Sequence, residues 1–236
     1  MSRTIAVFGA GTGLGTAVAR RFGREGYRVA LVARNRPRLD ALADALTGEG
    51  IEAAGFAADL ADPAGVPVLV TRITARFGRI DVVEYAPITT EGFTPATALD
   101  AATMRRHTDL FLLTPIEIVR AVLPQLLDRG DGGILIGQGS TAVHPRPHLS
   151  GAGPAMAATR NYIHSLHGEL ADRGVYAGVL HVGAMILGSA GHTAMLSGQM
   201  ATRLDVSQIP TVDPADLAET VWSMYTKRDA VEQHVS

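Results

Sequence analysis

The sequence predicts an α/β fold of three layers, in which one doubly wound parallel sheet is covered by helices on both faces. Short apolar runs alternate along the chain with longer helical patterns, as in consecutive βαβ units. The apolar runs are nearly continuous, which is typical of strands covered on both faces. No repeat or low-complexity linker divides the 236 residues. We therefore expect a single domain over residues 1–236.

Six strands and six helices are expected in alternation. The strands are Thr4–Phe8, Arg28–Ala33, Ile51–Ala57, Ile80–Tyr85, Gly133–Gly137 and Tyr176–Val182. The helices cover about Leu14–Glu25, Arg38–Leu46, Pro63–Phe77, Asp100–Asp128, Ala152–Asp172 and a last segment from Pro214 onward, which Asp213 caps. Pro115 and Pro124 should interrupt the fourth helix. The polar, glycine-rich stretch Gly188–Met200 is expected to be a mobile loop beside the cleft.

Composition limits the classes of function. The chain is 47% hydrophobic and 19% charged, as in a folded globular protein, and its net charge of −2 gives no basic surface for nucleic acid. It has no cysteine, which excludes disulfides and thiolate catalysis. Apolar runs such as Leu110–Leu113 fall short of the ~20 residues that span a membrane, and Met1–Phe8 does not resemble a signal peptide. We expect a cytoplasmic protein without a membrane or nucleic-acid partner.

A glycine-rich turn joins the first strand to the first helix. Gly9, Gly11, Gly13 and Gly15 alternate there with small or apolar residues. Glycines allow a tight turn and a close approach of the backbone to a pyrophosphate, whose negative charge the helix N-terminus favours. An ordinary flexible turn is the alternative. The position directly after the first strand favours a Rossmann-type dinucleotide site.

The end of the second expected strand indicates which dinucleotide binds. Sites for NAD place an acid there to hold the ribose hydroxyls, whereas an arginine accommodates the 2′-phosphate of NADP. This chain has Arg34 and Asn35 at that point, and the next acid is Asp40. A guanidinium binds phosphate through paired, charge-assisted hydrogen bonds. The sequence therefore favours NADP(H) over NAD(H), with a solvated strand-end charge as the alternative.

The spacing Gly9-x-x-x-Gly13-x-Gly15 resembles that of the short-chain dehydrogenase/reductase family, and the resemblance extends over most of the chain. Asp59-Leu60 is similar to the family's adenine-contacting pair, and Gly183 stands where the family has the glycine of a Pro-Gly pair. The resemblance implies cofactor contacts from Gly9, Gly11, Thr12, Gly13, Leu14, Gly15, Arg34, Asn35, Asp59, Leu60, Ala86, Pro87 and Gly183.

The catalytic residues of that family are missing. Its standard members use a tyrosine as general acid/base, a lysine four residues later, a serine and an asparagine. Lys227 is the only lysine here, and no tyrosine precedes it by four residues. Counted back from the end of the expected helix, the tyrosine and lysine positions fall on Ala152 and Met156. Only the serine has a counterpart, Ser140.

Other side chains could replace the missing proton donor. His144 and His148 lie in a loop that should overhang the nicotinamide, and histidine titrates near neutrality; surface histidines without a role are the alternative. Tyr85 ends the fourth strand as a candidate donor or as a packing aromatic. The neighbouring Glu84 is either a site acid or reaches solvent. His181 is expected to be a hydrogen-bonded core residue.

No metal site is expected from spacing along the chain, because the one histidine pair at i, i+4 spacing, His144 and His148, lies across prolines rather than on a helix. His164 and His167 are expected at exposed or interface positions of their helix. The resemblance also implies a homodimer or homotetramer in which Asp100–Asp128 and Ala152–Asp172 pair across a two-fold axis.

Two functions remain open at this point. The first is an NADP-dependent oxidoreductase that acts on a small carbonyl or alcohol through a non-standard proton donor. The second is a catalytically inactive dinucleotide-binding protein, such as a redox sensor or a partner subunit. The intact glycine turn supports both, and the missing tyrosine and lysine favour the second.

Overall fold

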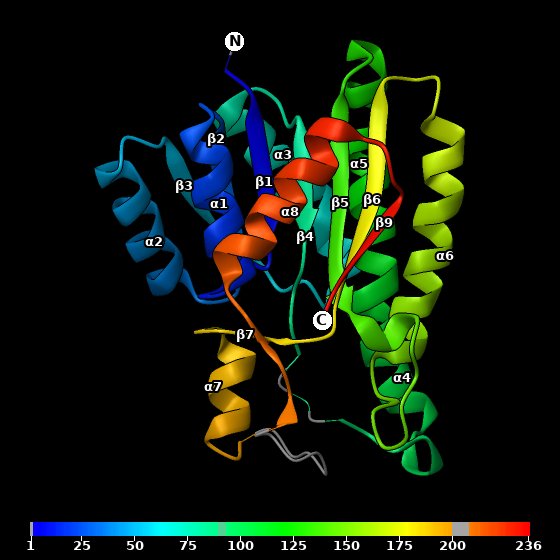
Figure 1. Cartoon of the computed structure of the whole chain (residues 1–236). Helices are drawn as coiled ribbons and strands as arrows, with labels where there is room; N and C mark the ends of the chain where they lie inside the picture. Colours follow the sequence, from blue (N-terminus) through cyan, green and yellow to red (C-terminus); the bar gives the residue numbers. More distant parts are fainter. Residues whose placement is uncertain (1, 90, 92, 200–207) are drawn as a thin grey trace.

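A seven-stranded parallel sheet forms the centre of the molecule (Figure 1). The computed structural model describes residues 2–89, 91, 93–199 and 208–236. The strand order is β3-β2-β1-β4-β5-β6-β9, and every neighbouring pair is parallel. This order confirms the predicted doubly wound α/β class. The strands are β1 (Thr4–Phe8), β2 (Arg28–Ala33), β3 (Ala53–Ala57), β4 (Val82–Tyr85), β5 (Gly132–Gly139), β6 (Val175–Val182) and β9 (Glu232–Val235).

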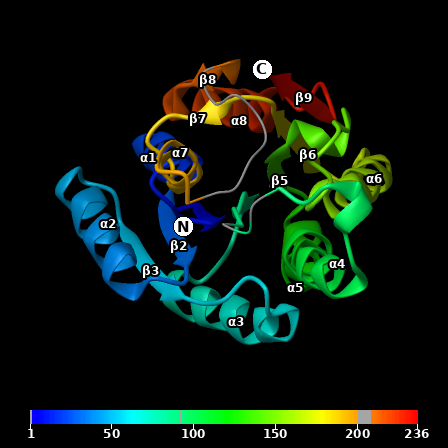
Figure 2. The same ribbon diagram turned by 90° about the horizontal axis from the view of Figure 1, so that it is seen from below.

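Helices cover both faces of the sheet, and each face has its own apolar core (Figure 2). One layer contains α1 (Leu14–Arg24), α2 (Arg36–Gly48) and α8 (Pro214–Lys227). The other contains α3 (Val66–Phe77), α5 (Thr114–Arg129) and α6 (Gly153–Leu170), preceded by the short turns η1 (Pro63–Gly65), η2 (Ala96–Ala98) and η4 (Ser140–Ala142).

The long helix expected over 100–128 is one run with a wide turn inside it. Helix α4 (Ala101–Thr108) passes through the π-helical turn η3 (Asp109–Leu113) into α5. Pro115 has no N–H to donate to the carbonyl of Phe111, and that carbonyl accepts from the hydroxyl of Thr159 instead. Pro124 lies inside α5 without ending it.

That helical run is the one place in the described residues where length and composition would suffice to cross a membrane. Its most apolar window has a mean hydropathy of 1.6, and 39% of that window is buried. The sequence prediction considered only shorter apolar runs and therefore did not identify this helical run as long enough to span a membrane. The side chains that face the sheet, Ile118, Val119, Val122 and Leu126, lie in the core of the domain, so in this structure the run is a core helix.

Several segments differ from the sequence prediction. The stretch expected to be a mobile loop contains α7 (Ala190–Leu196), because the side chain of Ser189 caps it by accepting from the N–H of His192 at 3.1 Å; Met200 lies outside the described residues. Two short strands, β7 (Met185–Ile186) and β8 (Thr211–Val212), pair beside it. Strand β9, which extends the sheet beyond β6, was not predicted at all.

The parallel arrangement brings the ends of the strands to one edge of the sheet. The glycine turn follows β1, Arg34 follows β2, Asp59 lies beyond β3, and Ala86 follows β4. Ser140 and Gly183 follow β5 and β6. Helix α7 and strand β7 lie below the same edge (Figures 1 and 2). Ligands of open parallel sheets bind at this carboxyl edge.

Candidate dinucleotide-binding and active site

The first glycine turn packs so closely on its surroundings that two of its positions exclude a side chain. Gly9 has φ +103°, and a Cβ there would lie 2.8 Å from the nitrogen of Pro87. At Gly15 a Cβ would lie 2.6 Å from the carbonyl oxygen of Gly9. The turn is also tied to β2, because the N–H groups of Gly9 and Ala10 both donate to the carbonyl of Val32 at 2.9 and 3.0 Å. Its shape is therefore fixed.

This turn delivers an uncapped helix N-terminus to the carboxyl edge. Gly13 is the N-cap of α1, and within the described part of the chain no side chain caps the helix. Gly11 and Thr12 are exposed beside it. The first N–H groups of a helix carry a partial positive charge, which makes such an end a binding site for phosphate.

The segment after β6 comes into contact with the glycine turn, which sequence reasoning did not foresee. The hydroxyl of Thr12 donates to the carbonyl of Gly188 at 2.8 Å. A Cβ on Gly13 would lie 2.8 Å from the Cβ of Ser189. Residues 186–189 therefore line the region in front of α1, and the small residue at position 13 is what allows their approach.

Among the residues predicted at the ends of β2 and β3, Asn35 and Asp59 accept hydrogen bonds from nearby backbone, and Arg34 is an exposed charge. The side chain of Asn35 accepts from the N–H of Arg38 at 3.0 Å and caps α2. Asp59 accepts from the N–H of Ala61 at 3.0 Å, and Leu60 is buried in the core. Arg34 is exposed directly after β2, and its guanidinium offers the paired donors that suit a 2′-phosphate.

Ser140 and Gly183 are neighbours at the opposite end of the edge. A Cβ on Gly183 would lie 3.3 Å from Oγ of Ser140. The side chain of Met156 lies next to Gly139, with its sulfur 3.7 Å from where a Cβ would stand. Met156 and Ala152 are both half-buried. Of the two positions predicted for the missing lysine and tyrosine, Met156 therefore lies beside Gly139, the residue before Ser140, and both positions carry apolar side chains.

Both candidate histidines lie on the loop between η4 and α6 and are exposed. His148 has φ +67°, a conformation that is rare for a residue with a side chain and costs about 1 kcal/mol or more. The ring of His144 lies 5.9 Å from the ring of His234, measured between centroids. His148 faces solvent, whereas His144 adjoins other histidines of the sheet edge.

Tyr85 is buried and does not reach the surface of the carboxyl edge. It is buried in the core between the sheet and α5, and its hydroxyl donates to the carbonyl of Leu110 in the π-helical turn. Burial raises the pKa of Tyr85 well above its usual value. The hydroxyl is therefore unavailable to a substrate in this conformation, and the packing alternative describes this residue.

Glu84 is buried in the opposite layer, so the expectation that it reaches solvent is wrong. It stands in register between Val7 of β1 and Leu135 of β5, and only 1% of it is exposed. Among the described residues, neither carboxyl oxygen has a hydrogen-bond partner. Burial raises the pKa of Glu84 to about 8, so the carboxyl group is protonated at neutral pH.

Comparison with known proteins identifies the family. The family model for short chain dehydrogenases matches residues 3–195, and the chain belongs to this family. A short chain dehydrogenase of Pseudocercospora fijiensis is 29% identical over 184 residues, which cover 78% of this chain and 60% of that protein. A fatty acyl-CoA reductase of Mycobacterium tuberculosis is 33% identical over 138 residues, which cover 56% of this chain and 46% of that protein. The matched part is thus about half of each relative.

Solved structures of similar fold cover nearly the whole chain. The L-sorbose reductase of Gluconobacter frateurii, complexed with NADPH and L-sorbose, has a TM-score of 0.87 at 20% identity, over 100% of this chain and 95% of that one. A short chain oxidoreductase of Pseudomonas aeruginosa PAO1, described as containing an atypical catalytic center, has a TM-score of 0.81 in its NADPH-bound form. It is 21% identical and covers 99% of this chain and 94% of that one. These likenesses confirm the fold.

Glu84 makes the stability of the protein depend on pH. An exposed glutamate in the unfolded chain loses its proton near pH 4.5, whereas the folded protein keeps it until about pH 8. The stability associated with Glu84 is therefore fully present below pH ~4.5 and is lost as pH rises through the folded-state pKa. Urea unfolding should show wild type losing about 1.4 kcal/mol per pH unit relative to Glu84→Gln between these pH values. A stability difference independent of pH would contradict the burial of an uncompensated carboxyl.

Proposed function

We propose that this protein is an NADP(H)-dependent oxidoreductase that interconverts a small carbonyl compound and its alcohol. The observation that carries the proposal is the glycine turn, which holds the uncapped N-terminus of α1 at the carboxyl edge of the sheet. The pyrophosphate would lie against the N–H groups of residues 12–14, once residues 186–189, which contact Thr12 and Gly13 in this structure, have moved aside. Family membership supports the same reading.

The choice of NADP(H) over NAD(H) rests on Arg34. It is the exposed cation at the end of β2, and the side chain of its neighbour Asn35 is engaged in capping α2. A guanidinium offers the paired donors that a 2′-phosphate accepts. The sorbose reductase and the Pseudomonas aeruginosa oxidoreductase of similar fold are described with NADPH bound, which supports this choice.

We assign the chemistry at the substrate to Ser140 and His148. When bound, the reduced nicotinamide supplies the hydride. Oγ of Ser140, beside Gly183, donates a hydrogen bond to the carbonyl oxygen of the substrate. The imidazolium of His148 gives its proton to the same oxygen as the alcohol forms. The strained backbone at His148 supports this role, since such conformations cluster at functional sites. His144 is the second candidate donor on the same loop.

A protein that binds the dinucleotide without turnover is the other candidate. The observation that favours it is the apolar pair Ala152 and Met156 beside Ser140, where the standard proton donor and its lysine are missing. The Pseudomonas aeruginosa protein of similar fold is called an oxidoreductase although its catalytic center is atypical. An oxidoreductase of this fold thus exists with an unusual catalytic center. This supports the enzyme over the protein that binds the dinucleotide without turnover.

Titration calorimetry tests the cofactor. NADPH should bind the wild-type protein more tightly than NADH does. Arg34→Asp should weaken NADPH by at least ten-fold and leave NADH within about two-fold, because the carboxylate repels the 2′-phosphate. Arg173→Asp, in the connection before β6 at the other edge of the sheet, is the matched control and should change neither affinity. Equal NADPH binding by wild type and Arg34→Asp would refute the assignment.

Turnover of NADPH with a panel of ketones and aldehydes tests the proton donor. His148→Ala should lower kcat by about 10²–10⁴-fold, which is the usual contribution of a general acid, and should leave the affinity for NADPH unchanged. His192→Ala on α7 is the control. If wild type binds NADPH but reduces no member of the panel, the binding protein replaces the enzyme. If His144→Ala alone abolishes turnover, the proton donor is His144.

We also propose a homodimer or homotetramer, located in the cytoplasm. The apolar side chains of the run Ala101–Arg129 extend beyond the face that packs in the core. Leu113, for example, is 41% exposed. On α6, Ala155 is buried against the domain while Ala158 is exposed. Light scattering after size-exclusion chromatography should give two or four times the chain mass, and Leu113→Glu should reduce it. Val68→Glu on α3 is the control. A monomeric wild type would contradict the proposal.

A further inference from the structure

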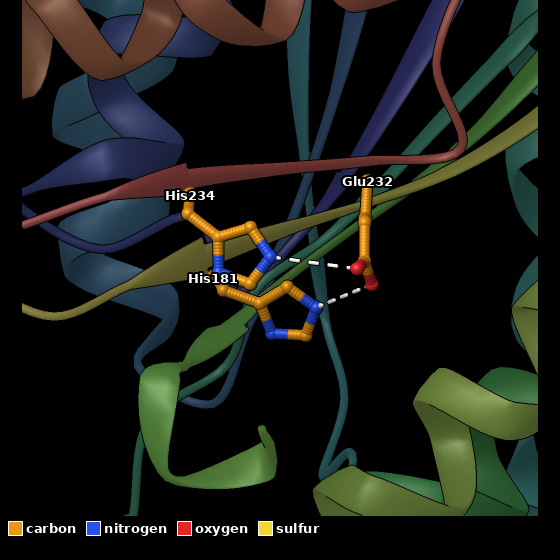
Figure 3. A group of neighbouring side chains, drawn as sticks. All are labelled: His181, Glu232 and His234. Carbon is orange, nitrogen blue, oxygen red and sulfur yellow. Dashed lines mark ion pairs between the residues drawn. The ribbon is translucent and has the colours of Figure 1, made fainter. Parts of the chain in front are cut away.

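Three potential metal ligands converge on one face of the sheet edge formed by β6 and β9 (Figure 3). His181 is the register partner of His234 across the two strands. Glu232 is two residues before His234 and therefore points to the same face. The nearest nitrogen and oxygen atoms of the three side chains all lie within 4.8 Å of one another. His181 thus forms one cluster with two residues that lie at least 51 positions further along the chain, which spacing along the chain could not reveal.

His181 carries the strongest indication of a missing partner. Its side chain is completely buried, and neither ring nitrogen has a hydrogen-bond partner among the described residues. The expectation of a hydrogen-bonded core residue is therefore confirmed for the burial of His181 and wrong for its hydrogen bonding. A buried polar atom without a partner costs about 1–3 kcal/mol.

Glu232 is ionised and held in position from α6. The guanidinium of Arg160 donates to both carboxylate oxygens at 2.7 and 2.9 Å, and Nε2 of His164 lies 2.9 Å from one of them. These contacts place the pKa of Glu232 well below its usual value, with the hydrogen bonds from Arg160 as the main cause. Such outer partners orient a metal-ligating carboxylate. His164 is therefore engaged within the subunit rather than exposed.

The distances suit a small divalent metal. Nε2 of His181 lies 3.5 Å from one oxygen of Glu232, and Nε2 of His234 lies 3.5 Å from the other (Figure 3). Ligands about 2.05 Å from a tetrahedral zinc stand about 3.3 Å apart. The two pairs are close to this spacing, and the rings of His181 and His234, which stack with centroids 4.8 Å apart, would tilt towards each other to share one ion. The positive charge of Arg160 opposes a cation at this point, so we expect micromolar affinity and not the tighter binding of a closed structural site.

We propose that His181, Glu232 and His234 bind a divalent transition metal of the zinc class, with a fourth position open to water or to a further ligand. Two imidazoles and one carboxylate are a donor set that zinc accepts. The ion would give Nε2 of His181 a partner and would join β9 to β6 through side chains, where the main-chain pairing covers only four register positions. This site is separate from the dinucleotide turn, which follows β1 at the centre of the sheet.

Equilibrium dialysis of the chelator-treated protein against Zn²⁺, with metal analysis of both chambers, tests the site. Wild type should retain one equivalent with a Kd of ~1–10 µM, and Zn²⁺ should raise its melting temperature. Substituting Co²⁺ should produce the visible absorption of a four-coordinate ion. His234→Ala, an exposed position, and Glu232→Gln should each weaken Zn²⁺ by at least ten-fold. His192→Ala, which removes a histidine outside the cluster, should bind like wild type.

Several outcomes would overturn the proposal. Wild type that binds no Zn²⁺ at 100 µM would mean that the cluster is an ion-pair network of Glu232 with its cationic neighbours. Binding that survives in His234→Ala and falls in His192→Ala would place the metal elsewhere. If circular dichroism shows that His234→Ala is not folded, His234→Gln replaces it, with the same loss expected. Binding of NADPH is measured alongside and should be the same in all of these variants, so a failure of this site leaves the proposed function standing.

Discussion

The close approach of the first glycine turn to the end of β4 is the constraint on which the rest of the site depends. Gly9 lies against the backbone of Ala86 and Pro87, and Gly15 lies against Gly9. Because side chains are excluded there, α1 can begin directly at the carboxyl edge of the sheet, with its first N–H groups uncapped. The segment after β6 then closes on the same turn through Thr12. A phosphate is the group that this arrangement suits.

The other half of the site, around Ser140, depends on side chains rather than on backbone positions. Ser140 keeps its place next to Gly183, but Ala152 and Met156 make the adjacent wall apolar. In the proposed reaction, the proton for the substrate oxygen comes from the exposed loop before α6, where His148 holds a strained conformation. The dinucleotide half of the site depends on backbone positions. The half near Ser140 depends on side chains, and these differ from the ones that are usual in the family.

Sequence patterns predicted the strands of the central sheet because their apolar runs are covered on both faces. They failed for β9, whose residues Glu232–Val235 are polar and form an edge strand, and for α7, which a capping serine stabilises in a polar stretch. Sequence patterns could not show towards which face of the sheet each side chain of β4 points. Neighbouring residues of a strand point to opposite faces, so Tyr85 points towards α5 and Glu84 towards α1. The histidine cluster depends on the register of β6 with β9, which no local pattern contains.

A crystal structure of the protein with NADPH bound tests the central claim most directly. We expect density for the pyrophosphate at the N-terminus of α1, within hydrogen-bond distance of the N–H groups of residues 12–14. We also expect the 2′-phosphate beside the guanidinium of Arg34 and the nicotinamide ring near Ser140. A dinucleotide bound away from the carboxyl edge of the sheet, or a glycine turn left empty at saturating NADPH, would contradict that claim.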